Sequence, residues 1–432
     1  MRWPRNRRIP RRAGRRTVSV PEVHDAIRMG TGSGPGTMNG KAALDFIDLF
    51  CGAGGFTWGW VRAGFVPRAA VDHDSAALRT HETNFGNTHC RSLHSDLGNI
   101  GVENLARLLS LKPRRLSVVV GGPPCQGWSK VGRGKIRSLG EAGRDLIADP
   151  RNALYRRFIE LVSFLQPRVC VMENVPGMLS IQKRNIADVV KVNFEEAGYR
   201  CTYSLVNARW FGVPQDRQRL IFVGTRQGDG PAVDASDLRG FSGEFRRKHL
   251  GIARETTVAD ALRDIPAIKD GSDVDPLLYR LAAGRPSRYA RIMREGSNGM
   301  LTDHVCRSHN AQDVEAFAFM KEGMQYYELP ERFKRYRDDI FPDKYKKLVW
   351  NRPAGTVTAH LAKDCYTHIH PRQARTISVR EAARLQSFPD GFRFFGNMGD
   401  RFRQIGNAVP PLMAWGIAEF IKTALSSEAN GR

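Results

Sequence analysis

The chain has 432 residues, of which 41% are hydrophobic and 26% charged, as in a soluble globular protein with one large domain and a smaller one. No apolar run approaches the roughly 20 residues of a membrane helix, and no apolar segment follows the N-terminal charges, so we expect neither a membrane span nor a secretory signal. The formal net charge of +23 indicates a polyanionic partner, most simply nucleic acid.

The cysteine pattern indicates a reducing compartment. The seven cysteines are odd in number, scattered and never in a C-x-x-C pair, which does not suit a disulfide framework. His304, Cys306 and His309 group three potential metal ligands, but no fourth ligand stands at a recognisable spacing. We therefore predict free thiols and no metal site.

Order is predicted to begin at about residue 41. Residues 1–16 hold eight arginines and no acid, and residues 29–40 are rich in glycine, serine and proline. Such compositions bury too little apolar surface to fold, so residues 1–40 are predicted to form a disordered basic tail.

From residue 41 to residue 228, apolar runs alternate with amphipathic segments. The runs predict strands at 43–50, 66–74, 115–120, 168–175, 199–208 and 219–226. The amphipathic segments predict a helix ending near Gly64 and further helices at 75–85, 102–111, 152–167 and 186–198. Strands that alternate with helices indicate an open, mostly parallel sheet covered on both faces.

Five polar or glycine-rich loops are each expected to follow a strand. They are Gly52–Gly55, Asp72, Asp96, Pro123–Cys125 and Glu173–Asn174. Because ligands bind beyond the carboxyl ends of the strands in such sheets, these loops are predicted to build one pocket.

After residue 228 the pattern changes. Residues 229–350 are polar and show no strand–helix alternation, which predicts a separate, loop-rich domain. Within it, residues 331–350 interleave aromatic and charged side chains, which suits packing on a nucleic-acid backbone and equally suits a charged surface helix. Helices are predicted again at 378–388 and at 404–425, the second of them apolar.

The glycine-rich stretch DLFCGAGGF follows the first predicted strand. Missing side chains at such a turn let a ligand approach the backbone, although a tight strand-to-helix turn also favours glycine. Some twenty residues on, Asp72 either accepts hydrogen bonds from ribose hydroxyls or caps the helix that begins at Ser75. Asp96 is similarly either a loop acid or an adenine acceptor. The sequence has no G-K-[ST] motif, which favours a nucleoside ligand without a phosphate chain.

The stretch GGPPCQGWS sets Cys125 in a stiff backbone after a buried strand. A structural thiol needs no such support, whereas a nucleophile must stand at a fixed place and angle. Glu173 ends another buried strand, where a carboxyl group is costly unless it is paired, satisfied by backbone amides or used as a proton donor. Arg217 and Arg219, two apart on a strand, face one side and either orient a base carbonyl or phosphate or lie at a surface edge without function.

Six motifs in this order resemble those of the S-adenosylmethionine-dependent DNA (cytosine-5)-methyltransferases. They are DLFCGAGG, GGPPCQGWS, ENV, QDRQR, RPAGTVTAH together with RTISVREAARLQSFPDGF, and QIGNAVPPLMA, from about residue 45 to residue 422. The joint occurrence of ordered motifs is far more specific than any one of them.

The resemblance implies an α/β fold, a doubly wound, mostly parallel, Rossmann-like methyltransferase sheet with a smaller, loop-rich target-recognition domain. Residues 41–228 would form the catalytic, cofactor-binding domain and residues 229–395 the target-recognition domain with its hinge. Residues 396–432 would return to the catalytic domain. The implied partner is double-stranded DNA. The implied setting is a monomeric enzyme of the bacterial cytoplasm that belongs to a restriction–modification system, with a cognate endonuclease as a further partner.

The resemblance also implies S-adenosylmethionine as cofactor. Asp72 with His73 would hold the ribose. Asp96 with Leu97 would hold the adenine. Asp rather than the commoner Glu at position 72, and His73 in place of a bulkier apolar or aromatic residue, depart from the family pattern and soften these individual contacts. The full set of predicted cofactor-binding residues is Phe50, Gly52, Gly54, Gly55, Asp72, His73, Asp96, Leu97, Pro123, Asn407 and Ala408.

The implied reaction is methyl transfer to C5 of a cytosine that is flipped out of the duplex. Cys125 would attack C6, and Glu173 would hold a proton at N3. Arg219, together with Arg217, would bind near O2 or the flanking phosphate. The segment 129–149, rich in glycine and basic residues, would close on the phosphates.

Three other functions compete with this one. An RNA cytosine methyltransferase shares the chemistry, and the basic excess and the long variable region favour DNA over RNA. A catalytically inactive DNA-binding regulator would not need Cys125, Glu173 and both arginines. A dinucleotide oxidoreductase would leave the thiol motif unexplained.

Overall fold

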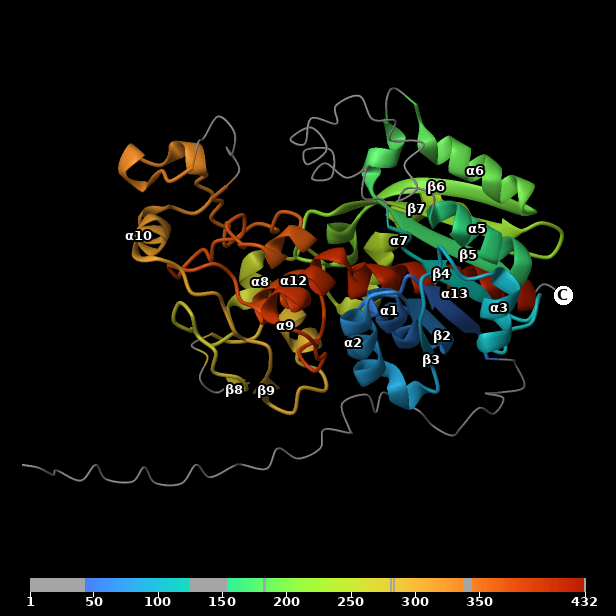
Figure 1. Cartoon of the computed structure of the whole chain (residues 1–432), viewed down its shortest axis with the longest axis horizontal. Coiled ribbons are helices and arrows are strands. Elements are labelled where there is room, and N and C mark those ends of the chain that lie inside the picture. Colours follow the sequence, from blue (N-terminus) through green and yellow to red (C-terminus); the bar gives the residue numbers. More distant parts are fainter. Residues whose placement is uncertain are drawn as a thin grey trace, which may run out of the picture.

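The computed structural model describes residues 43–124, 154–181, 184–279, 282, 284–336 and 344–430. A sheet with flanking helices stands beside a region of short helices and loops, coloured yellow to orange (Figure 1). Within the described ranges, no helix is both long enough and apolar enough to cross a membrane. The predicted basic tail, Cys125 and the predicted closing segment 129–149 lie outside the described residues.

The main sheet has seven strands, in the order β3-β2-β1-β4-β5-β7-β6. β1 to β5 pair in parallel, and β7 runs antiparallel between β5 and β6. The predicted α/β fold with an open, mostly parallel sheet is confirmed. The strands are β1 (Asp45–Leu49), β2 (Val66–Asp72), β3 (Arg91–His94), β4 (Val118–Gly121), β5 (Val169–Asn174), β6 (Tyr199–Asn207) and β7 (Gln218–Arg226).

Helices cover both faces of this sheet, because alternate side chains of each strand point to opposite faces. Phe46, Val118 and Val120 belong to one core, whereas Ile47 and Val119 belong to the other. The first core includes residues of α1 (Gly55–Arg62), α2 (Ser75–Phe85) and α13 (Pro411–Asn430). The second core includes residues of α3 (Val102–Leu108), α5 (Leu154–Leu165) and α6 (Ile186–Glu196).

Two predicted elements differ from the structure. The strand before Asp96 is β3, a sheet-edge strand of exposed and half-exposed residues that no apolar run had marked. The helix predicted at 404–425 is two helices, α12 (Met398–Asn407) and α13. Pro410 lies between them, and Pro411 is the first residue of α13. Proline lacks the N–H that a helix interior needs but is tolerated in the first turn, where α13 begins.

Between residue 229 and α12, the described chain consists of short elements joined by loops. β8 and β9 pair with each other in a second, two-stranded sheet. The elements are α7 (Leu238–Phe245), α8 (Val258–Leu262), β8 (Leu277–Leu278), α9 (Arg288–Met293), β9 (Met300–Leu301), α10 (Ala311–Phe319) and α11 (Val379–Leu385).

A small core around α10 is separate from the two cores of the sheet. At its centre the buried Asp313 accepts hydrogen bonds from the hydroxyls of Tyr345 and Tyr366 and from Arg335. For residues 331–350 we predicted either packing on nucleic acid or a surface helix, but Phe333 and Tyr345 are buried in this core instead. Its members are Ala316, Phe317, Met320, Tyr326, Leu329, Phe333, Tyr345 and Ile369.

The first core of the sheet continues past residue 228 into α7, α8, α9 and α11. α11 lies wholly inside it, with the side chain of Arg384 fully buried. Arg384 forms ion pairs of 2.9 Å with Asp264 and 2.6 Å with Asp390, which compensate the buried charge. Packing is therefore continuous across the predicted boundaries at 228/229 and 395/396, and the division into domains stays a prediction.

Candidate active site

The predicted loops lie at one edge of the main sheet. β1 to β5 are parallel, so their carboxyl ends share this edge. The glycine-rich turn follows β1, Asp72 ends β2 and Asp96 follows β3. Pro123 follows β4, and Glu173 is the penultimate residue of β5. The three acids, the glycine-rich turn and the segment that precedes Cys125 therefore lie at the same edge of the sheet.

The glycine-rich turn after β1 has an unusual backbone. Phe50, Gly52 and Gly54 have positive φ angles of 60°, 52° and 96°. A Cβ atom at Gly54 would lie 2.5 Å from the ring of Phe85, so only glycine fits there. No described atom lies within 4 Å of the corresponding Cβ position at Gly52, which leaves open space beside the backbone. A ligand can therefore approach the turn at Gly52.

Asp72 is a buried carboxylate held beside this turn. It accepts hydrogen bonds of 2.8 Å from the backbone N–H groups of Gly52 and Asp74, and the ring of His73 lies 3.4 Å away. Burial alone would raise the pKa of Asp72, but the hydrogen bonds from His73, Asp74 and Gly52 lower it below its ordinary value. The same contact with Asp72 raises the pKa of His73.

The helix cap after β2 is Asp74 and not Asp72. The side chain of Asp74 accepts hydrogen bonds from the backbone N–H groups of Ala76 and Ala77 at the start of α2. The alternative role that we considered for Asp72 is therefore wrong. Its carboxylate faces the glycine-rich turn instead.

Asp96 shapes its own turn at the surface. One carboxylate oxygen accepts a 2.8 Å hydrogen bond from the backbone of Gly98, and the other accepts a 2.7 Å bond from the side chain of Asn99. Each oxygen keeps capacity for a further hydrogen bond. The neighbouring Leu97 is buried in the second core. This arrangement leaves an exposed acid beside an apolar anchor.

Asp48, in β1 just before the turn, is a buried acid that our sequence interpretation missed. Its Oδ2 accepts hydrogen bonds from the backbone N–H (3.1 Å) and the hydroxyl (2.7 Å) of Thr57. Its Oδ1 has no hydrogen-bond partner in the described part of the chain. Burial raises the pKa of Asp48 to about 7, because an ionised carboxylate with an unpaired oxygen is costly inside a protein.

We expect Asp48→Asn to make the stability of the fold less dependent on pH. The folded-state pKa of Asp48 is raised, so its stabilising contribution is complete below the ordinary value of 3.8 and is lost as pH rises through about 7. Between pH 5 and pH 8 this group should cost the wild type about 3 kcal/mol, and the variant should escape that loss. Thermal unfolding across this range measures the difference, and parallel profiles for the two proteins would contradict it.

Glu173 and Arg219 form an ion pair at the end of β5. Arg219 Nε lies 2.6 Å from Glu173 Oε1, and both side chains are largely buried. A Cβ atom at Gly122 would lie 3.3 Å from Glu173 Oε2, and Asn174 Nδ2 donates a 3.3 Å hydrogen bond to the carbonyl of Pro123. The loop after β4 is therefore held against this ion pair.

Arg217 does not join that pair. Its buried guanidinium donates hydrogen bonds to the backbone carbonyls of Val357 (2.6 Å), Gly406 (3.0 Å) and Ala408 (3.0 Å). Burial lowers the pKa of Arg217, and the charge of Arg219 adds to this effect. The two arginines that the sequence predicted as one group therefore have different partners.

The segment after α12 returns to the glycine-rich turn. A Cβ atom at Gly55 would lie 2.2 Å from the carbonyl oxygen of Val409 and 3.4 Å from the Cβ of Ala408. Asn407, the last residue of α12, is exposed, and Ala408 is half-buried. These residues are brought next to the turn although more than 300 positions separate them from it in the sequence.

Gln215 is a second buried residue without a role in our sequence interpretation. Its Nε2 donates hydrogen bonds to the carbonyl of Leu385 (3.0 Å) and to Gln386 Oε1 (2.6 Å). Its Oε1 accepts a 2.9 Å hydrogen bond from the backbone N–H of Val357. Gln215 is the first residue of the QDRQR motif, and this position is the sequence signal that could have identified it.

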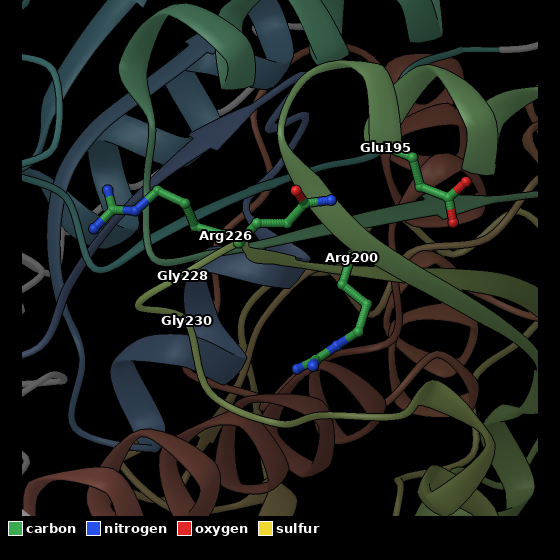
Figure 2. Close-up of a pocket in the computed structure, with 6 residues that line it drawn as sticks. Glu195, Arg200, Arg226, Gly228 and Gly230 are labelled. Carbon is green, nitrogen blue, oxygen red and sulfur yellow. The ribbon is translucent and has the colours of Figure 1, made fainter.

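Two hollows lined by described residues lie away from this edge. One, of about 640 Å³, is found where β6 begins and β7 ends, at the opposite edge of the main sheet. Figure 2 shows that the side chains of Glu195, Arg200 and Arg226 diverge there, and Arg226 is ion-paired with Asp229. These side chains converge on no common point. Nor do the described residues contain a cluster of His, Cys, Asp and Glu that could hold a metal ion.

A mostly parallel sheet with a glycine-rich turn and a buried carboxylate at its carboxyl edge is typical of α/β enzymes that bind nucleoside-type cofactors. The family model for C-5 cytosine-specific DNA methylases matches residues 44–423. The chain belongs to this family and is a DNA (cytosine-5)-methyltransferase.

Two bacterial type II methyltransferases and one solved structure resemble the chain over most of its length. The type II methyltransferase M.XorII of Xanthomonas oryzae pv. oryzae is 34% identical over 390 residues, covering 88% of this chain and 84% of that protein. The type II methyltransferase M1.HphI of Haemophilus parahaemolyticus is 32% identical, covering 88% and 87%. A solved structure described as a DNA modification methyltransferase from an E. coli prophage aligns with a TM-score of 0.68 at 27% identity, covering 89% and 100%.

Proposed function

We propose that the enzyme transfers a methyl group from S-adenosylmethionine to C5 of a flipped-out cytosine in a specific duplex sequence. The ion pair of Glu173 with Arg219 carries the proposal, because it lies against the loop that leads to Cys125. The resemblance to type II methyltransferases supports a role in restriction–modification. Such a system pairs the methyltransferase with an endonuclease of the same target sequence, and we propose that this enzyme acts as a monomer in the bacterial cytoplasm.

The carboxyl edge of the sheet suits S-adenosylmethionine. The open space at Gly52 admits a ligand, and the ionised Asp72 beside it can accept hydrogen bonds from the ribose hydroxyls. Asp96 and Leu97 would hold the adenine, while Phe50, Pro123, Asn407 and Ala408 complete the site. When bound, the cofactor supplies an electrophilic methyl group on a sulfonium.

Cys125 acts in this proposal as the nucleophile. It is joined by one peptide bond to Pro124, the last described residue of the loop beside Glu173. The thiolate bonds to C6 of cytosine, and the electron pair of the C5–C6 double bond makes C5 nucleophilic. After C5 has taken the methyl group, loss of the C5 proton restores the double bond and expels the thiolate.

Glu173 holds a proton at N3 of the ring, so that negative charge does not build up on the base during attack. Arg219 orients the carboxyl group through the 2.6 Å contact and can donate its remaining N–H groups to the O2 atom of cytosine. The two side chains thus bind the base edge on the side opposite the carbon that accepts the methyl group.

The base must leave the duplex to reach such a site, at a cost of a few kcal/mol of stacking and pairing. We propose that residues 229–395 recognise the target sequence, with phosphate contacts that position the duplex and a few side chains that read base edges. The separate core around Asp313 supports a distinct unit within this range. Segment 129–149 would close on the phosphates through its basic residues.

Transfer of tritiated methyl groups to duplex DNA and to transfer RNA tests the proposal. We expect label in DNA alone, and sequencing of 5-methylcytosine should then find one recurring target sequence. Label in RNA alone would support the competing RNA methyltransferase, and label in neither polymer would support an inactive DNA-binding regulator.

A further inference from the structure

Four segments that are far apart in the sequence meet in a buried polar network around Arg217. They are Gln215–Arg217, Val357, Leu385–Gln386 and Gly406–Ala408. We propose that Arg217 is a positioning residue that holds the segment after α12 against the cofactor loop, and that it does not touch the base. The inference rests on the proposed cofactor site.

The surroundings of Arg217 are those of a structural clamp. The side chain is 1% exposed and makes three hydrogen bonds, all to backbone carbonyls. Its Nε has no hydrogen-bond partner in the described residues. The charge of Glu173 favours the charged form of Arg217, but the carboxylate of Glu173 forms its ion pair with Arg219. Burying the guanidinium is costly, and its three hydrogen bonds to carbonyl oxygens must compensate that cost.

A second side chain, that of Gln386, also donates a hydrogen bond to the carbonyl of Ala408. Gln386 Nε2 donates a 2.7 Å hydrogen bond to the carbonyl oxygen of Ala408, which also accepts from Arg217. Gln386 is held in turn by Gln215, which also binds the N–H of Val357, while Arg217 binds the carbonyl of that residue. Val357 and Ala408 are therefore each held by hydrogen bonds from two different side chains.

The clamped segment abuts the cofactor loop directly. Ala408 precedes Val409, whose carbonyl oxygen is 2.2 Å from the Cβ position of Gly55. On its other side, the Cβ position of Gly406 lies 2.2 Å from the backbone nitrogen of Ala359, next to the stretch that contains Val357. Loosening the clamp should therefore widen the cofactor site, whereas Arg219 remains beside Glu173.

The test compares Arg217→Lys with Arg219→Lys. Lysine keeps the charge but loses the planar fork that binds several carbonyls at once. For Arg217→Lys we expect the Kd of S-adenosylhomocysteine, measured by calorimetry without DNA, to rise about 10-fold to 100-fold, the scale of one or two charge-assisted hydrogen bonds. The kcat at saturating cofactor should fall far less than this. Arg219→Lys should show the reverse, a lowered kcat with an unchanged Kd.

An Arg217→Lys protein with unchanged Kd and strongly lowered kcat would overturn the inference, because Arg217 would then act on the base. If that variant does not fold, Gln386→Met removes the other donor to Ala408 and should raise the Kd by itself; an unchanged Kd would overturn the inference as well.

Where both variants fold, the effect of the double variant on the Kd should be smaller than the product of the two single effects. An effect equal to that product would count against a shared carbonyl. A wild-type protein that binds no S-adenosylhomocysteine would refute the proposed function instead.

Discussion

Cys125→Ser should abolish methyl transfer, lowering kcat by more than about 10⁴-fold, the scale on which the loss of a covalent nucleophile acts. A serine hydroxyl is a far weaker nucleophile at neutral pH than a thiolate, and no other described cysteine replaces the thiol. Burial raises the pKa of both Cys90 and Cys201 to about 12, so these remain protonated thiols. Tritiated methyl transfer to duplex DNA measures the loss.

Two controls separate the role of Cys125 from damage to the fold. The Cys125→Ser variant should bind S-adenosylhomocysteine as the wild type does, and Cys201→Ser, a change at a buried thiol in β6, should keep its activity. On an oligonucleotide with 5-fluorocytosine at the target, the wild type should form a covalent adduct, because fluorine cannot leave C5 as a proton does. Turnover by Cys125→Ser, or an adduct through another residue, would refute the assignment.

Glu173→Gln should lower kcat by about 10²-fold to 10⁴-fold, as is typical of a group that transfers a proton. Glutamine has the shape of glutamate and can still accept a hydrogen bond from Arg219, so the 2.6 Å contact and the loop at Gly122 are preserved as far as possible. What the variant lacks is a carboxyl proton for N3 of the ring. Single-turnover methyl transfer with saturating cofactor and DNA isolates this step.

Glu195→Gln is the matched control for this second prediction. Glu195 is an exposed glutamate in α6, next to the hollow at the opposite edge of the sheet, and its replacement should leave kcat unchanged. An unchanged rate for Glu173→Gln as well would return Glu173 to a structural role, as the partner of Arg219 and the support of the loop at Gly122.

Most elements of the sheet could be predicted because their signals are local. The apolar runs at 43–50, 66–74 and 168–175 mark β1, β2 and β5, since a parallel strand buried on both faces needs apolar side chains throughout. β3 could not be found in this way. It is the outermost strand on one side of the sheet, where exposed side chains leave no apolar run.

The candidate site was predictable in part. The order of the motifs identified the family, and the placement of loops after strands put Asp72 and Glu173 at the same edge. The helix cap was not predictable, because Asp72 and Asp74 both precede α2 and only backbone geometry selects Asp74. The buried Asp48 was not predicted, since a carboxyl group inside an apolar strand has no distinguishing spacing.

By itself, the sequence determined the class of fold, the family and the residues whose side chains can take part in the reaction. Apolar periodicity and motif order can be read from the order of residues along the chain. Only the tertiary structure decided which partner each residue has. Arg217 and Arg219 are two positions apart, yet one binds the carbonyls of Val357 and Ala408 and the other binds Glu173. The reason is physical: a hydrogen bond depends on distance and direction in space, and the carbonyls that Arg217 binds come from segments more than 130 residues away.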